Sequence, residues 1–340
     1  MPKTVFLGMS GGVDSSVSAA LLKQQGYKVV GVYMKNWSRD LPGMQCPWAR
    51  DLADAKRVAT QLDIDFQVFD FEKEYKKQVV DYMLAEYSAG NTPNPDIMCN
   101  QEIKFKLFFE TAQKQGADLI ATGHYAQSKN GQLLKATDEN KDQTYFLYRM
   151  PQEALNKTIF PIGHLAKPEV KQLAKDFGLH VAKKPESMGV CFVGEVGIHE
   201  FLSEFIDAKP GEIRQAETDQ FLGTHEGAIF YTLGQRHGLS LGGGLPYYVV
   251  GKNITKNIIY VSTDLNHPAL WATEIQLKDI LLRETPPKNL LIRLRHRAPL
   301  QKATLEGNTL HFQDAIRTPS PGQSAVFYSD EICLGGGIVE

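Results

Sequence analysis

A run rich in glycine and serine near the start of the chain has the composition of a phosphate-binding loop. The run is Ser10-Gly11-Gly12-Val13-Asp14-Ser15-Ser16, and it follows a short apolar stretch. Glycines let the backbone approach a phosphate closely, and the N–H groups at a helix start attract anions. Serine hydroxyls would add donors, and Asp14 could hold a metal or order the loop. The run matches neither a Walker A loop nor GxGxxG, and the simpler alternative is a serine-capped turn.

Cys99 has a second feature of a reactive site close to it in sequence. It follows Asn94-Pro95-Asp96 and precedes a predicted helix, whose dipole would stabilise a thiolate. If the segment is helical, Asp96 shares a face with Cys99. Its carboxylate could then accept a proton or raise the thiol pKa. Sequence leaves both outcomes open, together with the alternative of a cysteine packed under a turn.

The other cysteines have different surroundings. Cys191 follows Lys183 and Lys184 in a glycine-containing segment, and nearby cations favour a reactive thiolate over a small core residue. Cys333 lies in a strand-like run and is interpreted as core, whereas Cys46 is interpreted as a loop residue without a catalytic role. The spacings fit neither zinc pairs nor a secreted disulfide scaffold.

Alternating strand and helix patterns must position these residues. The strand-like runs of the first half are 5–9, 28–34, 65–69 and 117–122. The helical runs are 14–25, 47–62, 72–87, 101–115 and 167–177. This order predicts an α/β fold with a doubly wound parallel sheet.

The second half has a different pattern. Glycines become frequent and strands short after about residue 195, which predicts a small β-rich module. The later strand-like runs are 290–296, 303–305, 309–312, 325–328 and 332–339, and they predict a small antiparallel β-barrel. The predicted domains are therefore 1–195, 196–265 and 266–340.

Basic residues cluster at the start of the expected barrel. Arg293, Arg295 and Arg297 have the spacing that places side chains on one face of a strand, with His296 and Lys302 close in sequence. A row of guanidinium groups suits a phosphate backbone. The alternative is a solvated strand face.

The overall composition excludes a uniformly basic nucleic-acid-binding protein. The chain has 340 residues, with 37 basic and 39 acidic side chains and a net charge of −2, so any nucleic-acid surface must be local. No apolar run approaches the length of a membrane span, and the first residues lack the apolar region of a signal peptide. We therefore expect a cytoplasmic protein without membrane association.

Several motifs together resemble the tRNA-specific 2-thiouridylase family over nearly the whole chain. The Ser10–Ser16 run is similar to the pyrophosphate loop (PP-loop) of the ATP-pyrophosphatase superfamily. The matching runs are Gly8–Ser16, Thr92–Asp96, Cys99-Asn100, Ile103–Lys106, Ala121–Tyr125, Lys141–Gln143, Tyr145–Leu147, Gly189–Phe192 and Thr232–Arg236.

The resemblance implies an enzyme, a tRNA-uridine 2-sulfurtransferase. ATP with Mg²⁺ would adenylate O2 of the wobble uridine, and sulfur would replace that oxygen. Cys191 would carry a persulfide from a sulfur donor protein, either a sulfur carrier or a cysteine desulfurase. Cys99 would act as nucleophile and Asp96 as base or positioning group. Whether the persulfide attacks directly or Cys99 first releases hydrosulfide stays open, and both routes end in a Cys99–Cys191 disulfide. We expect a monomer that binds one tRNA.

The resemblance also implies binding residues. The implied ATP contacts are Gly8, Met9, Ser10, Gly11, Gly12, Val13, Asp14, Ser15, Met34 and Gly123. The implied tRNA contacts, around a base that has left its stack, are Asn94, Pro95, Asp96, His124, Lys141, Asp142, Gln143, Arg295, His296 and Gln323. From composition alone, residues 141–143 would be an exposed turn and His124 a structural residue.

Other functions make different demands on the same sequence. A ligase that passes nitrogen to the adenylated oxygen would have no use for Cys99 and Cys191. A non-catalytic RNA-binding protein would not need the intact glycine loop. An iron–sulfur thiolase would need CxxC-type cysteines, which the chain lacks.

Overall fold

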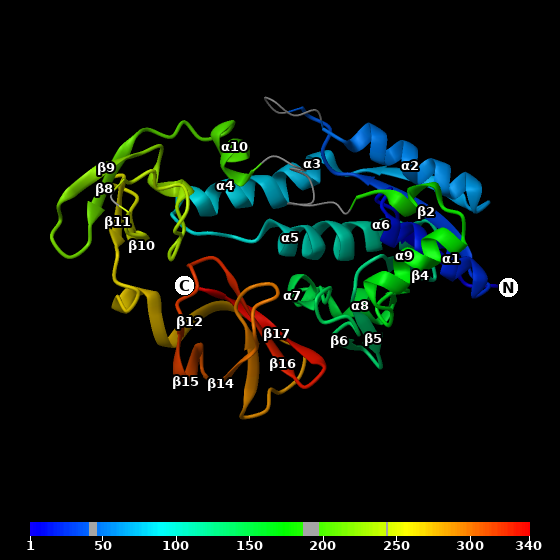
Figure 1. The fold of residues 1–340 in the computed structure, drawn as a ribbon. Helices are drawn as coiled ribbons and strands as arrows, with labels where there is room; N and C mark the ends of the chain where they lie inside the picture. The colour runs from blue at the N-terminus through cyan, green and yellow to red at the C-terminus, as the bar shows by residue number, and fades with distance from the viewer. Residues whose placement is uncertain (41–45, 186–196, 243) are drawn as a thin grey trace. The chain divides into compact units, whose positions relative to one another are not determined.

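The computed structural model describes residues 1–40, 46–185, 197–242 and 244–340, and the chain divides into two compact units (Figure 1). The first unit comprises Met1–Val80, Pro95–Ile198 and Tyr328–Leu334. The second comprises Asp81–Asn94, His199–Phe327 and Gly335–Glu340. Among the described helices, none is long and apolar enough to span a bilayer.

A parallel sheet forms the centre of the first unit, with strand order β3-β2-β1-β4-β7. Its strands are β1 (Thr4–Gly8), β2 (Lys28–Lys35), β3 (Asp65–Asp70), β4 (Leu119–Thr122) and β7 (Thr158–Ile159). β1 pairs with β2 on one side and with β4 on the other. The winding direction reverses between β1 and β4, where Gly8 lies opposite Thr122. This is the switch point at which doubly wound sheets bind ligands, and the predicted fold class is confirmed.

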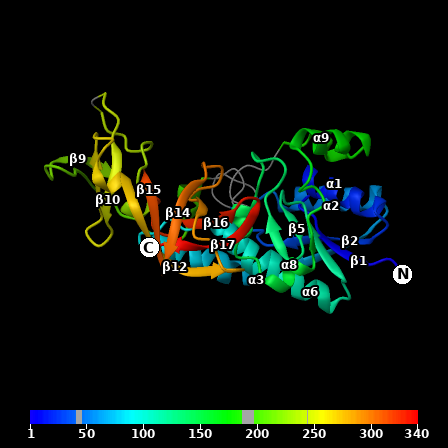
Figure 2. The ribbon, with the colours of Figure 1, turned by 90° about the horizontal axis from the view of Figure 1, so that it is seen from below.

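Helices cover both faces of this sheet (Figure 2). On one face, α1 (Val13–Gln24), α2 (Trp48–Gln61) and α9 (Lys167–Asp176) share a buried cluster with Val5 and Leu7. On the other, Phe6 packs 6.5 Å from Phe69, and Phe69 packs 6.1 Å from Phe108, between ring centroids. Successive β1 residues therefore face opposite apolar layers, as in a sheet buried on both sides.

The remaining described helices are mostly short. They are α3 (Glu72–Tyr75), η1 (Lys76–Val80), α4 (Asp81–Ser88), α5 (Pro95–Met98), η2 (Cys99–Leu107), α6 (Phe108–Lys114), α7 (Thr144–Leu147), α8 (Gln152–Asn156), η3 (His180–Lys183), α10 (Ile198–Ser203), η4 (Ala228–Phe230) and η5 (Pro268–Leu270). η1 and η2 are π-helices. α5, η2 and α6 follow one another without a break, so the helix predicted from residue 101 begins earlier, at Pro95.

β-Structure dominates the second half, as predicted. β8 (Gly211–Gln215), β9 (Phe221–His225), β10 (Tyr248–Asn253) and β11 (Ile258–Ser262) form a sheet in the order β10-β11-β8-β9. The barrel strands are β12 (Trp271–Leu282), β13 (Leu290–Arg293), β14 (Gln301–Glu306), β15 (Thr309–Arg317), β16 (Ser324–Ser329) and β17 (Ile332–Val339). Their order is β12-β15-β14-β13-β16-β17, and pairing of β12 with β17 closes the barrel.

The tip of the β16–β17 hairpin belongs to the first unit. There Cys333 of β17 pairs with Leu133 of the hairpin formed by β5 (Gln127–Lys129) and β6 (Gln132–Leu134). Both residues are fully buried. The interpretation of Cys333 as a core residue is therefore confirmed.

Candidate nucleotide and thiol site

The glycine loop joins β1 to α1 at the switch point of the sheet. Gly11 has φ +73°, a left-handed conformation that favours glycine, and Gly12 is extended. Gly12 is the N-cap of α1 and supplies no side-chain hydrogen bond. The helix start therefore has no side-chain cap of its own, which suits it to an anion.

Hydroxyl groups of the loop hold its own backbone. Ser16 is fully buried, and its Oγ donates to the Gly12 carbonyl at 2.7 Å. Ser15 Oγ accepts from the Ser10 N–H at 3.2 Å. The expectation that Ser16 offers a hydroxyl donor to phosphate is therefore wrong. Ser10, by contrast, is exposed, so its hydroxyl stays accessible.

Asp14 has two partners that sequence reasoning missed. Lys167 Nζ donates to its Oδ1 at 2.6 Å, and the Tyr125 hydroxyl donates to the same oxygen at 3.1 Å. Of the two roles considered for Asp14, these contacts support ordering the loop. The partners lie 153 and 111 positions away in sequence, so no local spacing could have revealed them.

Three of the implied ATP residues come together where β1, β2 and β4 end. A Cβ added to Gly123 would lie 2.8 Å from the Ser15 nitrogen, so the end of β4 touches the first turn of α1. A Cβ on Gly8 would lie 2.9 Å from Met34 Cε. Glycine at these positions lets the backbone segments meet without a side chain between them.

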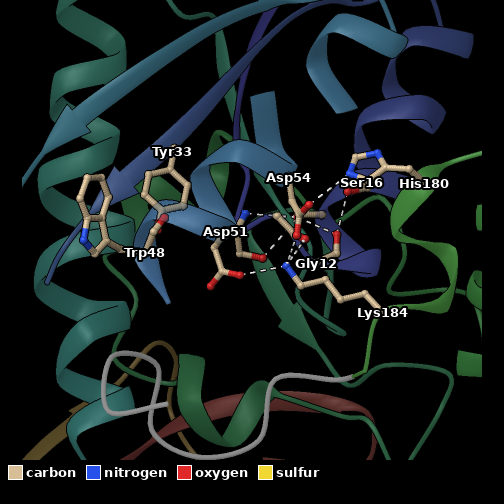
Figure 3. Close-up of polar contacts among 11 residues, drawn as sticks. Gly12, Ser16, Tyr33, Trp48, Asp51, Asp54, His180 and Lys184 are labelled. Atoms are coloured by element: carbon tan, nitrogen blue, oxygen red, sulfur yellow. Dashed lines mark hydrogen bonds and ion pairs between the residues drawn. The ribbon is translucent and has the colours of Figure 1, made fainter. Parts of the chain in front are cut away.

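Lys184 lies against the glycine loop, near Gly12, Asp51 and Asp54 (Figure 3). Its Nζ donates to the Gly11 carbonyl at 3.0 Å, to Asp51 Oδ1 at 2.9 Å and to Asp54 Oδ2 at 2.5 Å. His180 Nε2 lies 3.3 Å from Asp54 Oδ1. The sequence had suggested Lys184 as a cation that activates Cys191, but its three N–H groups are committed here.

The ionised state of Asp54 fits this contact. Partial burial would raise the pKa of its carboxyl, but hydrogen bonds and charge from Lys184 and His180 outweigh burial and leave the pKa lowered. Beside the pair, the Tyr33 hydroxyl donates to the Trp48 carbonyl at 3.2 Å, which ties β2 to the start of α2 (Figure 3).

Cys99 is a buried, protonated thiol. It has no exposed surface, and burial raises its pKa to about 11. The charge of Lys104 and a hydrogen bond with Tyr75 lower the thiol pKa, whereas the charge of Asp96 raises it further. The predicted stabilisation by a helix start is wrong, because Cys99 follows a full turn of α5. Of the two effects considered for Asp96, its charge disfavours the thiolate.

The charge of Lys104 acts on both Cys99 and His124. In a π-helix the residue five positions on lies above the first, so η2 places Lys104 on the Cys99 side. Burial, followed by the charge of Lys104, lowers the pKa of His124 well below its usual value. The ring is therefore neutral at pH 7. Its centroid lies 5.8 Å from that of the Phe105 ring, and its Nδ1 lies 2.9 Å from Thr122 Oγ1. Because His124 follows Gly123 and packs on Phe105, the loop and the helix that carries Cys99 lie at the same end of the sheet.

The segment implied to contact tRNA around Asp142 is not the exposed turn that composition suggested. Asp142 is 1% exposed, and its carboxylate accepts from the Thr144 hydroxyl at 2.9 Å and from the Ala136 N–H at 3.2 Å. Gln143 Oε1 accepts from the Tyr125 N–H at 2.9 Å. Asp142 therefore holds the fold, and only Lys141 and Gln143 of this run retain partial exposure.

Gln323 contacts the chain just before Asn94 within the second unit. Its Nε2 donates to the Thr92 carbonyl at 2.5 Å, and the Thr92 N–H donates to the Pro321 carbonyl at 2.7 Å. A Cβ on Gly322 would lie 3.0 Å from the Thr92 nitrogen. The turn at 321–323 therefore supports the approach to Asn94-Pro95-Asp96.

The predicted arginine row is wrong. β13 ends at Arg293, which is 8% exposed. Arg295, His296 and Arg297 lie in the following turn, where Arg297 has φ +64°. Arg295 and Arg297 are exposed, but strand alternation does not align them.

The remaining site predictions concern sulfur and metal. Cys191 lies outside the described residues, whereas Lys183 just before that segment is exposed. Cys46 is buried, and its Sγ lies 3.6 Å from the Trp37 carbonyl. Cys46, Cys99 and Cys333 are free thiols. Within the described ranges, no group of three His, Cys, Asp or Glu side chains could hold a metal ion.

Comparison with known proteins decides the family. Three family models match in order: a tRNA methyl transferase HUP domain over residues 3–195, a tRNA methyl transferase PRC-barrel domain over 199–263 and an aminomethyltransferase beta-barrel domain over 272–339. A tRNA-specific 2-thiouridylase MnmA of Halalkalibacterium halodurans is 47% identical over 99% of this chain and 94% of the relative. This chain belongs to the tRNA-specific 2-thiouridylase family. A Streptococcus agalactiae member is 46% identical, over 99% of this chain and 95% of its own length.

As a member of the tRNA-specific 2-thiouridylase family, the chain is a sulfurtransferase. Among solved structures, a 4-thiouridine synthetase–RNA complex with bound ATP is 18% identical and has a TM-score of 0.40, over 59% of this chain and 50% of that one. That likeness is too distant to assign residues. The three matched family models begin and end close to the predicted domain boundaries, which stay a prediction.

Cys99 should titrate far above neutral pH. Because burial raises its pKa to about 11, the folded protein should show no Cys99 thiolate at pH 7. Thiolate absorbance at 240 nm, recorded as the difference between the wild type and Cys99→Ser, should rise only above about pH 10. A difference already present at pH 8 would contradict the buried thiol.

Replacing Asp142 should cost stability. Asp142→Ala removes the acceptor for the Thr144 hydroxyl and the Ala136 N–H in a buried place, so the free energy of unfolding should fall by about 2 kcal/mol or more. Urea unfolding followed by circular dichroism measures the change. Lys141→Ala is the matched control and should leave stability nearly unchanged. Equal stability of Asp142→Ala and the wild type would contradict the structural role of the Asp142 carboxylate.

Proposed function

We propose that this enzyme uses ATP to replace O2 of the wobble uridine of tRNA, position 34, with sulfur. The observation that carries the proposal is the meeting, at one end of the parallel sheet, of a buried thiol and a glycine loop whose helix start lacks a side-chain cap. The loop leaves β1, and Gly123-His124 leaves the neighbouring β4; Gly123 packs against the first turn of α1, and the His124 ring lies 5.8 Å from the Phe105 ring of η2, the helix that begins with Cys99. The relatives' name, tRNA-specific 2-thiouridylase, supports tRNA as substrate.

ATP solves the leaving-group problem of this reaction. The uridine O2 attacks the α-phosphorus and pyrophosphate departs, which turns a carbonyl oxygen into an AMP ester that can leave. The Gly11–Ser15 backbone would bind the departing phosphates. Mg²⁺ would arrive with ATP and neutralise developing charge; Asp14 is the nearest loop carboxylate, and it is held by Lys167.

Sulfur would come from a persulfide on Cys191. The terminal sulfur adds to C2 and AMP leaves with the oxygen; Cys99 then attacks Cys191 Sγ, which frees the thiocarbonyl and forms a Cys99–Cys191 disulfide. Alternatively, Cys99 attacks first and expels hydrosulfide, which adds to C2. Both routes leave two cysteines oxidised, so a two-electron reductant must restore them before the next turnover.

Cys99 needs help to become a nucleophile. A thiol with a pKa about 11 is almost entirely protonated at neutral pH, so its reaction requires a base or a change in its surroundings. Asp96 lies close enough for its charge to reach the thiol, and we assign it as base or positioning group. The charge of Lys104 lowers the thiol pKa and would stabilise the thiolate once formed.

The proposed setting follows from this chemistry. The tRNA would present an unstacked uridine to Asn94, Pro95, Asp96 and His124, with Arg295, His296 and Gln323 as further contacts. A sulfur donor protein must load Cys191. The enzyme would act in the cytoplasm as a monomer.

Thiolation tests the proposal directly. The protein is incubated with unmodified tRNA, Mg-ATP and a persulfide donor protein, and 2-thiouridine is measured by mass spectrometry after digestion. Cys99→Ser and Cys191→Ser should each lower product formation about a thousandfold or more, because each removes a reacting sulfur. Release of pyrophosphate, which precedes sulfur transfer in the proposed mechanism, should persist in both variants.

Cys46→Ser is the matched control. The serine hydroxyl can donate to the Trp37 carbonyl in place of the Cys46 thiol. Thiolation should therefore stay near the wild-type rate. Undiminished thiolation by Cys191→Ser with the protein donor would reject the persulfide role. Incorporation of nitrogen in place of sulfur would replace the proposal with the ligase alternative.

A further inference from the structure

We propose that Lys184 is a positioning residue that holds the Gly11–Gly12 peptide so that the Gly12 N–H points to the phosphates of ATP. The inference rests on the proposed use of ATP. It concerns a side chain that contacts a carbonyl of the loop, and that would act on ATP through backbone geometry.

The argument starts with one peptide plane. In a trans peptide, the carbonyl of one residue and the N–H of the next point in opposite directions. Lys184 Nζ holds the Gly11 carbonyl at 3.0 Å. The Gly12 N–H therefore points away from Lys184, toward the side where α1 begins and where an anion would lie.

A loop of two glycines needs such an anchor. Gly11, at φ +73°, and Gly12 can rotate their shared peptide with little steric cost, since neither has a Cβ. A rotated peptide would present its carbonyl oxygen to the phosphates in place of its N–H. The contact with Lys184 opposes that rotation, and the Asp51 backbone, whose oxygen lies 2.3 Å from a Cβ added to Gly11, packs directly against the loop.

Charge separates this role from direct phosphate binding. The Lys184 ammonium donates to Asp51 at 2.9 Å and to Asp54 at 2.5 Å, and its side chain is 19% exposed. Two carboxylates already offset its single charge, and its three donors have three acceptors. Lys184 therefore contributes orientation, and α2, which carries both carboxylates, fixes where the ammonium sits (Figure 3).

Comparing ATP with AMP tests the role. AMP lacks the β- and γ-phosphates that the Gly12 N–H would meet. In Lys184→Met, the dissociation constant for ATP measured by calorimetry should rise about tenfold, the value of one hydrogen bond to a charged group, whereas that for AMP should change by less than about twofold. Lys183→Met removes an exposed neighbouring lysine and should leave both constants unchanged.

A milder variant covers the case in which Lys184→Met does not fold. Asp54→Asn keeps the side-chain shape but removes one of the charges that locate the ammonium, and it should weaken ATP binding more than AMP binding. Equal losses for the two nucleotides, or unchanged ATP affinity in a folded Lys184→Met, would overturn the positioning role. Failure of the wild type to bind ATP would instead reject the proposed function.

Discussion

The contact between the end of β4 and the first turn of α1 is the constraint on which the site depends. Position 123 has no room for a side chain, because a Cβ would lie 2.8 Å from the Ser15 nitrogen. That contact fixes the next residue, His124, beside the loop. The His124 ring packs on Phe105 of η2, the helix that begins with Cys99. The glycine loop and the helix that carries the buried thiol are thereby joined through one pair of neighbouring strands.

The lysines next to the loop are already neutralised by carboxylates. Lys167 pairs with Asp14, and Lys184 pairs with Asp51 and Asp54. These two cations therefore order the loop and its surroundings, and under the proposed use of ATP the favourable field for the nucleotide would come from N–H dipoles and from the metal ion bound to its phosphates. Such fixed dipoles need no rearrangement when charge develops during reaction.

Local sequence patterns predicted what depends on local sequence. Strand and helix alternation gave the doubly wound sheet, and the Ser10–Ser16 run gave the loop at its switch point. Partners more than a hundred positions apart, such as Lys167 for Asp14, exist only once the chain is folded. The same holds for burial. Burial makes Asp142 a hydrogen-bond acceptor inside the core, and it raises the pKa of Cys99, whereas a helix start would have lowered that pKa. The arginine row failed because β13 ends at Arg293.

The enclosed thiol has a consequence for survival under oxidative stress. Hydrogen peroxide attacks thiolates that solvent can reach. A sulfur that is both protonated and buried therefore resists conversion to sulfenic acid. Cys99 has no exposed surface and keeps its proton at neutral pH. A resting molecule thus preserves this sulfur in its reduced form, and in the proposed mechanism oxidants could compete for it only once the thiol loses its proton.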